Sequence, residues 1–220
     1  MPNPGEHHPA FEEYCECIYE LHEDNLDVIQ ARIADRLRVS RPSVSEMVHR
    51  MHAEGLLILD GNKISLTANG EELAQRVVRR HRIAERFLTD VLNLSWAQAH
   101  QEAGKWEHVI SDEVEEALER VLGNPTTCPH GNPIPGTDYD PPEMMPLAQV
   151  GVGQQFVVSR IPEELEFTPG MLDFLEQYNL IPGGRGVVSG FGREGDMTVE
   201  VDGTQVAVES FATQRILVTL

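Results

Sequence analysis

The chain has 220 residues, 40% of them hydrophobic and 24% charged, which is ordinary for a globular protein of one large domain or two small ones. It contains no apolar run of roughly 18 residues or more and no signal-like N-terminus, so we expect no membrane association and a cytoplasmic location. Three cysteines are too few for a disulfide framework. A net charge of -19 argues against a surface that coats nucleic acid or anionic lipid over its whole extent.

The first 66 residues predict a winged helix-turn-helix. Apolar residues at helical spacing indicate a helix over about 10–23 and a shorter one over 28–37, and Ser40 with Pro42 is typical of the start of a third. Two apolar runs around the tip Asp60-Gly61-Asn62 then predict a hairpin. A mainly α fold with a small β component is therefore expected.

This region also holds a basic island, since residues 27–50 carry five arginines against three acids. In a helix-turn-helix the N-terminal end of the second helix reaches base edges while flanking cations neutralise phosphates. A structural or protein-binding module is the alternative. We assign DNA contacts to Arg32, Ser40, Arg41, Pro42, Ser43, Ser45, Arg50 and Lys63.

Beyond the hairpin, two long helices are predicted. Thr67 caps one that runs to about Leu92, and Ser95 caps another that ends near Leu122. They should pack as an antiparallel pair or meet a partner subunit. The proline-rich residues 124–146 predict an extended linker. Short β runs follow, which favour a small β-barrel; they are 155–161, 186–191, 197–201, 205–208 and 215–220, with a helical pattern at 170–178.

Histidines and carboxylates recur at helical spacing along both long helices. His81 and Glu85 are four residues apart, and we expect His100, Glu107 and His108 on one face of the second helix. Each residue alone is more often a solvated surface group, but two such stripes on neighbouring helices favour a metal site. Glu13 and Glu16 are weaker candidates that would tie the first helix to this site. Enzyme motifs such as H-E-x-x-H, G-x-S-x-G and the P-loop do not occur, so we predict no enzyme activity.

Several longer stretches together resemble the diphtheria toxin repressor and manganese transport regulator family. They are 31–34, 42–45, Arg80–Arg86, Trp106–Glu115 and Cys128–Gly136. The resemblance spans nearly the whole chain and implies a homodimeric, metal-activated transcriptional repressor, of metal-uptake genes, that reads a palindromic operator. It implies a winged-helix domain at 1–74, a helical metal-binding and dimerisation domain at 75–124, a linker at 125–146 and an SH3-like (FeoA-like) domain at 147–220.

The resemblance also assigns ligands. His81, Glu85 and His100 match an ancillary metal site, and Glu107 and His108 match a primary site. Glu13 falls where the iron branch has Met and the manganese branch Asp, and Glu16 matches a carboxylate of the manganese branch. From the third domain, Glu166 is expected as a ligand, with Glu163 and Glu164 as its alternatives.

One residue departs from the family pattern, because Gly104 stands where the family has a ligating Cys or Glu. Glu102, water or another ligand would then fill the gap, or the site is altered. Without Met or Cys at the expected positions, oxygen ligands favour Mn(II), with Fe(II) as the alternative. A metalloenzyme, or a DNA-binding regulator with a purely structural metal, are the other hypotheses.

Overall fold

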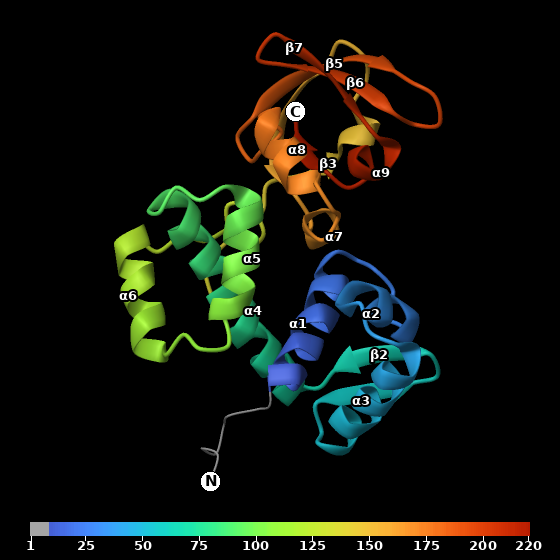
Figure 1. The fold of residues 1–220 in the computed structure, drawn as a ribbon. Coiled ribbons are helices and arrows are strands. Elements are labelled where there is room, and N and C mark those ends of the chain that lie inside the picture. The colour runs from blue at the N-terminus through green and yellow to red at the C-terminus, as the bar shows by residue number, and fades with distance from the viewer. Residues whose placement is uncertain (1–8) are drawn as a thin grey trace.

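The computed structural model describes residues 9–220, which form three lobes (Figure 1). The first lobe contains α1 (Pro9–Glu23), α2 (Gln30–Leu37), α3 (Arg41–Ala53) and the antiparallel hairpin β1 (Leu57–Asp60) and β2 (Lys63–Leu66). Ser40 caps α3, since its Oγ accepts a hydrogen bond from the Ser43 N–H at 3.2 Å. Apolar residues at helical spacing, such as Ile18, Ile33 and Val48, form the core of this lobe. The predicted order of helices and hairpin is present.

The second lobe contains α4 (Ala68–Asp90), α5 (Trp96–Trp106) and α6 (Asp112–Leu122). The prediction of a single helix from Ser95 to Leu122 is wrong, because the chain turns after Trp106. Ser111 then starts a new helix by accepting a hydrogen bond from the Val114 N–H, and three acidic residues occupy the first turn of α6, where they stabilise a helix N-terminus. Glu107 therefore caps α5 and His108 lies beyond it. At the other end, α4 runs without a break through the domain boundary expected at 74/75.

The proline-rich segment after α6 has little regular structure but packs against the protein. Cys128, His130 and Asn132 are completely buried. The guanidinium groups of Arg79 and Arg82 on α4 donate hydrogen bonds to carbonyl oxygens of this segment. The segment is therefore a fixed part of the structure as well as a connection between lobes.

The third lobe is built on one antiparallel sheet of six strands in the order β3-β8-β4-β5-β6-β7. The strands are β3 (Met145–Pro146), β4 (Gln155–Arg160), β5 (Arg185–Phe191), β6 (Met197–Val201), β7 (Thr204–Val208) and β8 (Leu217–Thr219). Short helices complete it: η1 (Leu147–Gln149), α7 (Glu163–Glu166), α8 (Met171–Gln177) and α9 (Ser210–Thr213). The expected barrel is not closed. The edge strand β3 has two residues, and one of them, Pro146, has no N–H to donate to a closing strand.

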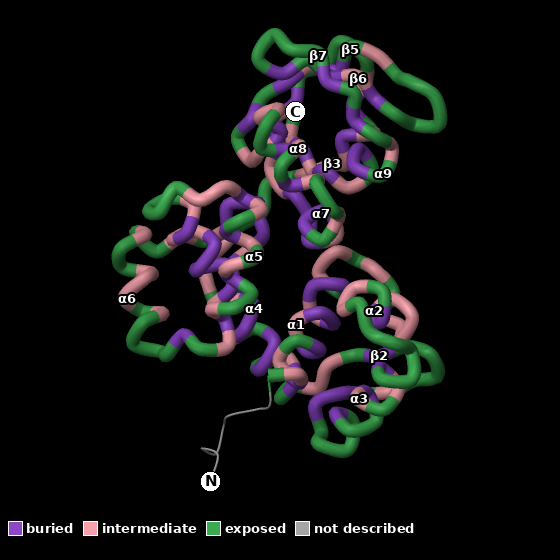
Figure 2. The backbone as a smooth tube through the Cα atoms, viewed as in Figure 1, coloured by how far each residue is buried: buried purple, intermediate pink, exposed green. Residues whose placement is uncertain are grey.

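Burial differs sharply between the helices (Figure 2). The inward faces of α1 and α4 are buried, whereas α6 has no buried residue within this single chain. Five large apolar side chains of the second lobe are exposed, namely Val91, Leu92, Val109, Val114 and Val121. Among residues 9–220, no helix has the length and apolar character needed to cross a membrane.

Candidate metal centre

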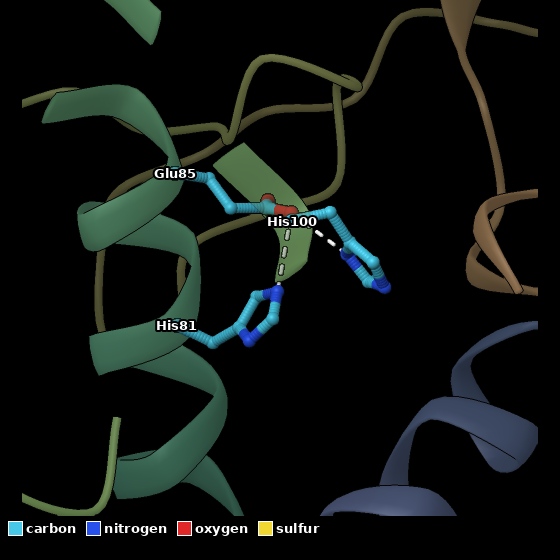
Figure 3. A group of neighbouring side chains, drawn as sticks. All are labelled: His81, Glu85 and His100. Carbon is cyan, nitrogen blue, oxygen red and sulfur yellow. Dashed lines mark hydrogen bonds and ion pairs between the residues drawn. The ribbon is translucent and has the colours of Figure 1, made fainter. Parts of the chain in front are cut away.

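The predicted histidines and carboxylates of the two long helices converge around Glu85. The i,i+4 spacing on α4 points His81 and Glu85 to the same side, and α5 brings His100 opposite them (Figure 3). Glu85 Oε1 lies 3.1 Å from His81 Nε2 and 3.0 Å from His100 Nδ1. Glu85 is buried and His81 nearly so. The three residues expected at the ancillary site are therefore together.

A second group forms where α1 crosses the end of α5. Ligand atoms of Glu16, His81 and Glu107 all lie within 4.8 Å of one another. Glu107 Oε2 accepts a hydrogen bond from His81 Nδ1, and Glu107 Oε1 lies 3.2 Å from His108 Nε2. The residues expected at the primary site thus share His81 with the ancillary group, which the sequence did not predict. We call Glu16, His81, Glu107 and His108 the α1 cluster.

The structure also places the other two candidates for the α1 cluster, Glu13 and Glu102. The carboxylate that contacts His108 belongs to Glu12, whose Oε2 lies 2.7 Å from His108 Nδ1. Glu13 is exposed and forms no ion pair within residues 9–220, but it lines the same cavity as Glu16 and Glu107. Glu102 does not fill the gap at Gly104, because its carboxylate binds Lys105 at 2.6 Å and is 40% exposed. Gly104 instead lines a cavity that Glu16 and Glu107 also line.

A third group extends from Glu85 into the proline-rich segment. Glu85, Cys128 and His130 place their ligand atoms within 4.8 Å of one another. Glu166 of α7 lies 2.9 Å from His130 Nδ1 and 3.3 Å from His100 Nδ1. We call the group formed by Glu85, His100, Cys128, His130 and Glu166 the linker cluster. Glu166 was expected, whereas Cys128 and His130 were not assigned as ligands.

The two alternatives to Glu166 have other partners. Glu163 binds the buried guanidinium of Arg82 at 2.9 Å, and Glu164 binds Arg215 at 2.5 Å. Both contacts satisfy a cation of the protein itself. Neither residue belongs to a group of metal-ligating atoms found among the described residues.

The electrostatics of the two clusters fit a bound cation. Burial, followed by the neighbouring carboxylates Glu107 and Glu20, raises the pKa of Glu16 well above its usual value. Burial works against the charged form of His81, yet Glu85 and Glu107 raise its pKa well above the usual range. Both shifts favour a proton on Glu16 and on His81, and a divalent cation could replace these protons.

Buried polar atoms without hydrogen-bond partners also indicate a cation site. Within residues 9–220, His81 Nε2, both ring nitrogens of His130 and Glu166 Oε2 are buried without a hydrogen bond, although carboxylate oxygens lie close by. Buried polar atoms without partners are rare, and several that converge on one region are typical of an ion site. Imidazole nitrogen, carboxylate oxygen and one thiol make a donor set suited to divalent first-row metals.

Contacts around the clusters connect the first lobe to the third. The Arg36 guanidinium on α2 lies 4.3 Å from the centre of the Phe167 ring, which also meets the His100 ring edge-on at 5.2 Å. Arg36 is paired with Glu20 at 3.3 Å. On the other side, Arg160 of β4 binds Asp24 at 2.9 Å. Phe167 therefore touches both a candidate ligand and the helix-turn-helix.

The residues assigned to DNA lie away from the clusters. Arg41, Pro42 and Ser43 are exposed in the first turn of α3, and Lys63 is exposed at the start of β2. The Arg32 guanidinium donates to Asp27 O at 2.6 Å, and Arg50 packs over Phe11 at 5.4 Å. Ser40 is engaged as the cap of α3, and Ser45 is half-buried. An exposed N-terminus of α3 is the arrangement that the DNA hypothesis requires.

Family models match three parts of the chain. Residues 8–63 match the N-terminal DNA-binding domain of iron-dependent repressors, residues 67–136 match their metal-binding and dimerisation domain, and residues 145–220 match a FeoA domain. The iron-dependent repressor IdeR of Mycobacterium leprae (strain TN) is 51% identical over 126 residues, covering 57% of this chain and 55% of the relative. The diphtheria toxin repressor of Corynebacterium diphtheriae is 47% identical over 128 residues, covering 58% and 57%. The match thus spans a little over half the length of these curated relatives.

Solved structures match over nearly the whole chain. A manganese-dependent transcriptional repressor in complex with manganese superimposes with a TM-score of 0.83 at 30% identity, covering 95% of this chain and 99% of the other. The manganese regulator SloR gives a TM-score of 0.76 at 32% identity, covering 95% and 97%. The relatives named here are regulators and not enzymes. The chain therefore belongs to the family of iron- and manganese-dependent repressors that includes the diphtheria toxin repressor.

Proposed function

We propose that this chain is a metal-activated DNA-binding repressor, with Mn(II) as its preferred metal. The observation that carries the proposal is the series of alternating imidazoles and carboxylates from α1, through α4 and α5, to His130 and Glu166. This series joins all three lobes at one buried place. A cation bound there would restrain the first lobe relative to the others.

Each cluster would hold one cation. Glu16, His81, Glu107 and His108 are proposed as ligands of the α1 cluster, with Glu13, which lines the same cavity, as a further candidate. Glu85, His100, Cys128, His130 and Glu166 are proposed as ligands of the linker cluster. The metal supplies positive charge that replaces protons among crowded carboxylates. Because Glu16 lies on α1 and the other ligands of its cluster lie on or after α4 and α5, binding fixes how the helix-turn-helix is held.

The resulting switch would act through the pose of the DNA-reading helix. α1 packs on α4 and supports α2, so its position determines where α3 lies. To move such an equilibrium from mostly inactive to mostly active, the metal must favour the active pose by about 5 kcal/mol. Binding of a divalent ion by several charged ligands supplies free energy of this order through linkage.

The choice of Mn(II) follows from the donors of the α1 cluster, which offers only carboxylate oxygen and imidazole nitrogen. Oxygen ligands suit Mn(II), whereas thiolate favours iron and later metals. Cys128 brings one soft donor to the linker cluster, which keeps Fe(II) as the second candidate. The relatives divide in the same way, since the IdeR of Mycobacterium leprae is named as an iron-dependent repressor and the solved repressor at a TM-score of 0.83 as a manganese-dependent one.

DNA recognition is proposed to use Arg41, Ser43 and Ser45 at the N-terminus of α3, with Arg32, Arg50 and Lys63 on phosphates. A homodimer would place two α3 helices about one helical turn of DNA apart, which requires a palindromic operator. The exposed valines of the second lobe support a dimer, because Val114 and Val121 lie seven residues apart on one stripe of α6 and are 48% and 66% exposed. The dimer would act in the cytoplasm, where the DNA lies.

The test is fluorescence anisotropy of a labelled palindromic operator taken from the protein's own genome, titrated with protein in chelator, Mn(II) or anaerobic Fe(II). Binding that requires metal, and less Mn(II) than Fe(II), is the expected result. Equal affinity in chelator would show a structural metal. A His108→Ala variant should remain a folded dimer but lose the metal dependence, whereas turnover of a substrate without specific DNA binding would favour a metalloenzyme.

A further inference from the structure

His108 contacts a carboxylate that is not among the proposed ligands. Its ring lies between two carboxylates from different elements. Nε2 lies 3.2 Å from Glu107 Oε1, a member of the α1 cluster, while Nδ1 lies 2.7 Å from Glu12 Oε2 in the first turn of α1. The side chains of His108 and Glu12 are only 15% and 13% exposed.

The two ring nitrogens of a neutral histidine have different roles, since one carries a proton and the other a lone pair. A carboxylate that accepts a hydrogen bond from Nδ1–H keeps the proton there and leaves the lone pair on Nε2. A carboxylate that accepts a hydrogen bond from the nitrogen opposite the metal fixes the imidazole ring and makes it a stronger ligand. Loss of such a carboxylate typically lowers metal affinity about 10–100-fold.

We propose that Glu12 is the positioning residue of the α1 cluster: it accepts a hydrogen bond from His108 Nδ1 and so directs Nε2 toward Glu107 and the metal. The proposal rests on the metal-binding role proposed for this cluster. It gives the first turn of α1 a second connection to the metal centre, independent of Glu16.

Packing separates Glu12 from its neighbour Glu13. Phe11, Tyr14 and Cys15 bury one face of α1, and the face that carries Glu12 meets the end of α5. Glu13, one residue or about 100° further round the helix, is exposed and lines the cavity without contacting His108 through a hydrogen bond or ion pair within residues 9–220. A loose surface ion pair would not hold both partners at this low exposure.

The experiment compares Glu12→Gln and Glu12→Ala with the wild type, and uses Glu116→Gln on exposed α6 as a control for the loss of one negative charge. Mn(II) affinity is measured from the electron paramagnetic resonance signal of free Mn(II). We expect E12A to weaken binding about 10–100-fold, E12Q to weaken it less, and E116Q to leave it unchanged.

A second readout does not depend on metal. In ¹⁵N-histidine-labelled, metal-free protein at a pH where the ring is neutral, ¹⁵N NMR should show His108 protonated on Nδ1, with the resonance assigned through a His108→Gln variant. E12A should shift the proton toward Nε2. If the wild type bound no Mn(II), the proposed function would fail while this tautomer would still report on Glu12.

Two results would overturn the positioning role. Unchanged Mn(II) affinity and an unchanged tautomer in E12A would leave Glu12 as an ordinary surface carboxylate. Equal losses in E12Q and E12A, with the His108 tautomer unaltered, would make Glu12 a direct metal ligand.

Discussion

Filling the gap at Gly104 should strengthen metal binding without disturbing the fold. A Cβ built on Gly104 has no atom within 4 Å beyond its own helix backbone and chain neighbours, and the residue lines the cavity shared by Glu16, His81 and Glu107. A side chain placed there can therefore point toward the α1 cluster. The variants Gly104→Glu and Gly104→Cys add a hard and a soft ligand, and Gly104→Ala is their control.

The control variant Gly104→Ala is expected to change helix stability and not metal affinity. Replacing a helical glycine with alanine is worth about 0.5–1 kcal/mol, which is expected to raise the melting temperature of a chain of this size by roughly 1–4 °C. The ligand-adding variants gain metal affinity as well. We expect G104E to bind Mn(II) at least about tenfold more tightly, or about 1.4 kcal/mol. G104C should gain more for Zn(II) or Fe(II) than for Mn(II), because thiolate is soft.

Competition with a chelator of known affinity measures each dissociation constant, and thermal unfolding of metal-free protein measures the helix effect. If all three variants bound Mn(II) as the wild type does, the cavity beside Gly104 would not be the metal site. A gain in G104A equal to that in G104E would show that helix stability, and not the added carboxylate, controls affinity.

Three further predictions concern the linker cluster and its surroundings. Glu85→Gln removes a carboxylate that lies within 3.4 Å of three imidazoles and should lower metal affinity at least about tenfold, measured by calorimetry against Glu116→Gln; equal affinities would contradict the cluster. Phe167→Leu should destabilise the metal-free protein by about 1 kcal/mol through the lost cation–π contact. Phe191→Leu replaces a ring that is also exposed but has no cation–π contact within residues 9–220 and should change stability by less than about 0.5 kcal/mol, and equal denaturation midpoints would refute the contact. Although burial opposes it, Glu166 and Glu85 raise the pKa of His100 to about 10, so metal binding near neutral pH displaces protons and affinity should rise with pH; calorimetry in buffers of different ionisation enthalpy would detect this release, and its absence would refute the assignment.

Local spacing predicted much of the candidate site. The i,i+4 pair His81 and Glu85 lies on one face of α4 because a regular helix leaves no other choice. The same rule failed for Glu107 and His108, because α5 ends at Trp106 and the chain turns before Ser111 starts a new helix. These residues still reach the cluster, through a turn whose direction depends on tertiary packing.

Cys128 and His130 were not predicted as ligands for a different reason. Cys128 and His130 lie in a segment whose composition is typical of a linker, and no periodicity indicates which way an irregular segment points. The available signal in the sequence was Cys128-x-His130 directly followed by Gly131. In the structure this glycine packs closely on β4, because a Cβ on Gly131 would lie 2.3 Å from Ser159 O. The choice between Glu12 and Glu13 depends on how the face of α1 is packed, which spacing alone leaves open.

Glu85 makes the two clusters a single thermodynamic unit. His81 faces Glu107 with one nitrogen and Glu85 with the other, and Glu85 in turn contacts His100 and His130. A neutral imidazole offers one lone pair, so His81 can bind one cation at a time. When the metal ion in one cluster takes this lone pair, the other ring nitrogen carries the proton and faces the other cluster. The first and second metal ions should therefore bind with macroscopic constants that belong to the pair. If the proposed function holds, the steepness of the response to metal concentration should then be set by this histidine and carboxylate, which lie outside α3, the helix proposed to read DNA.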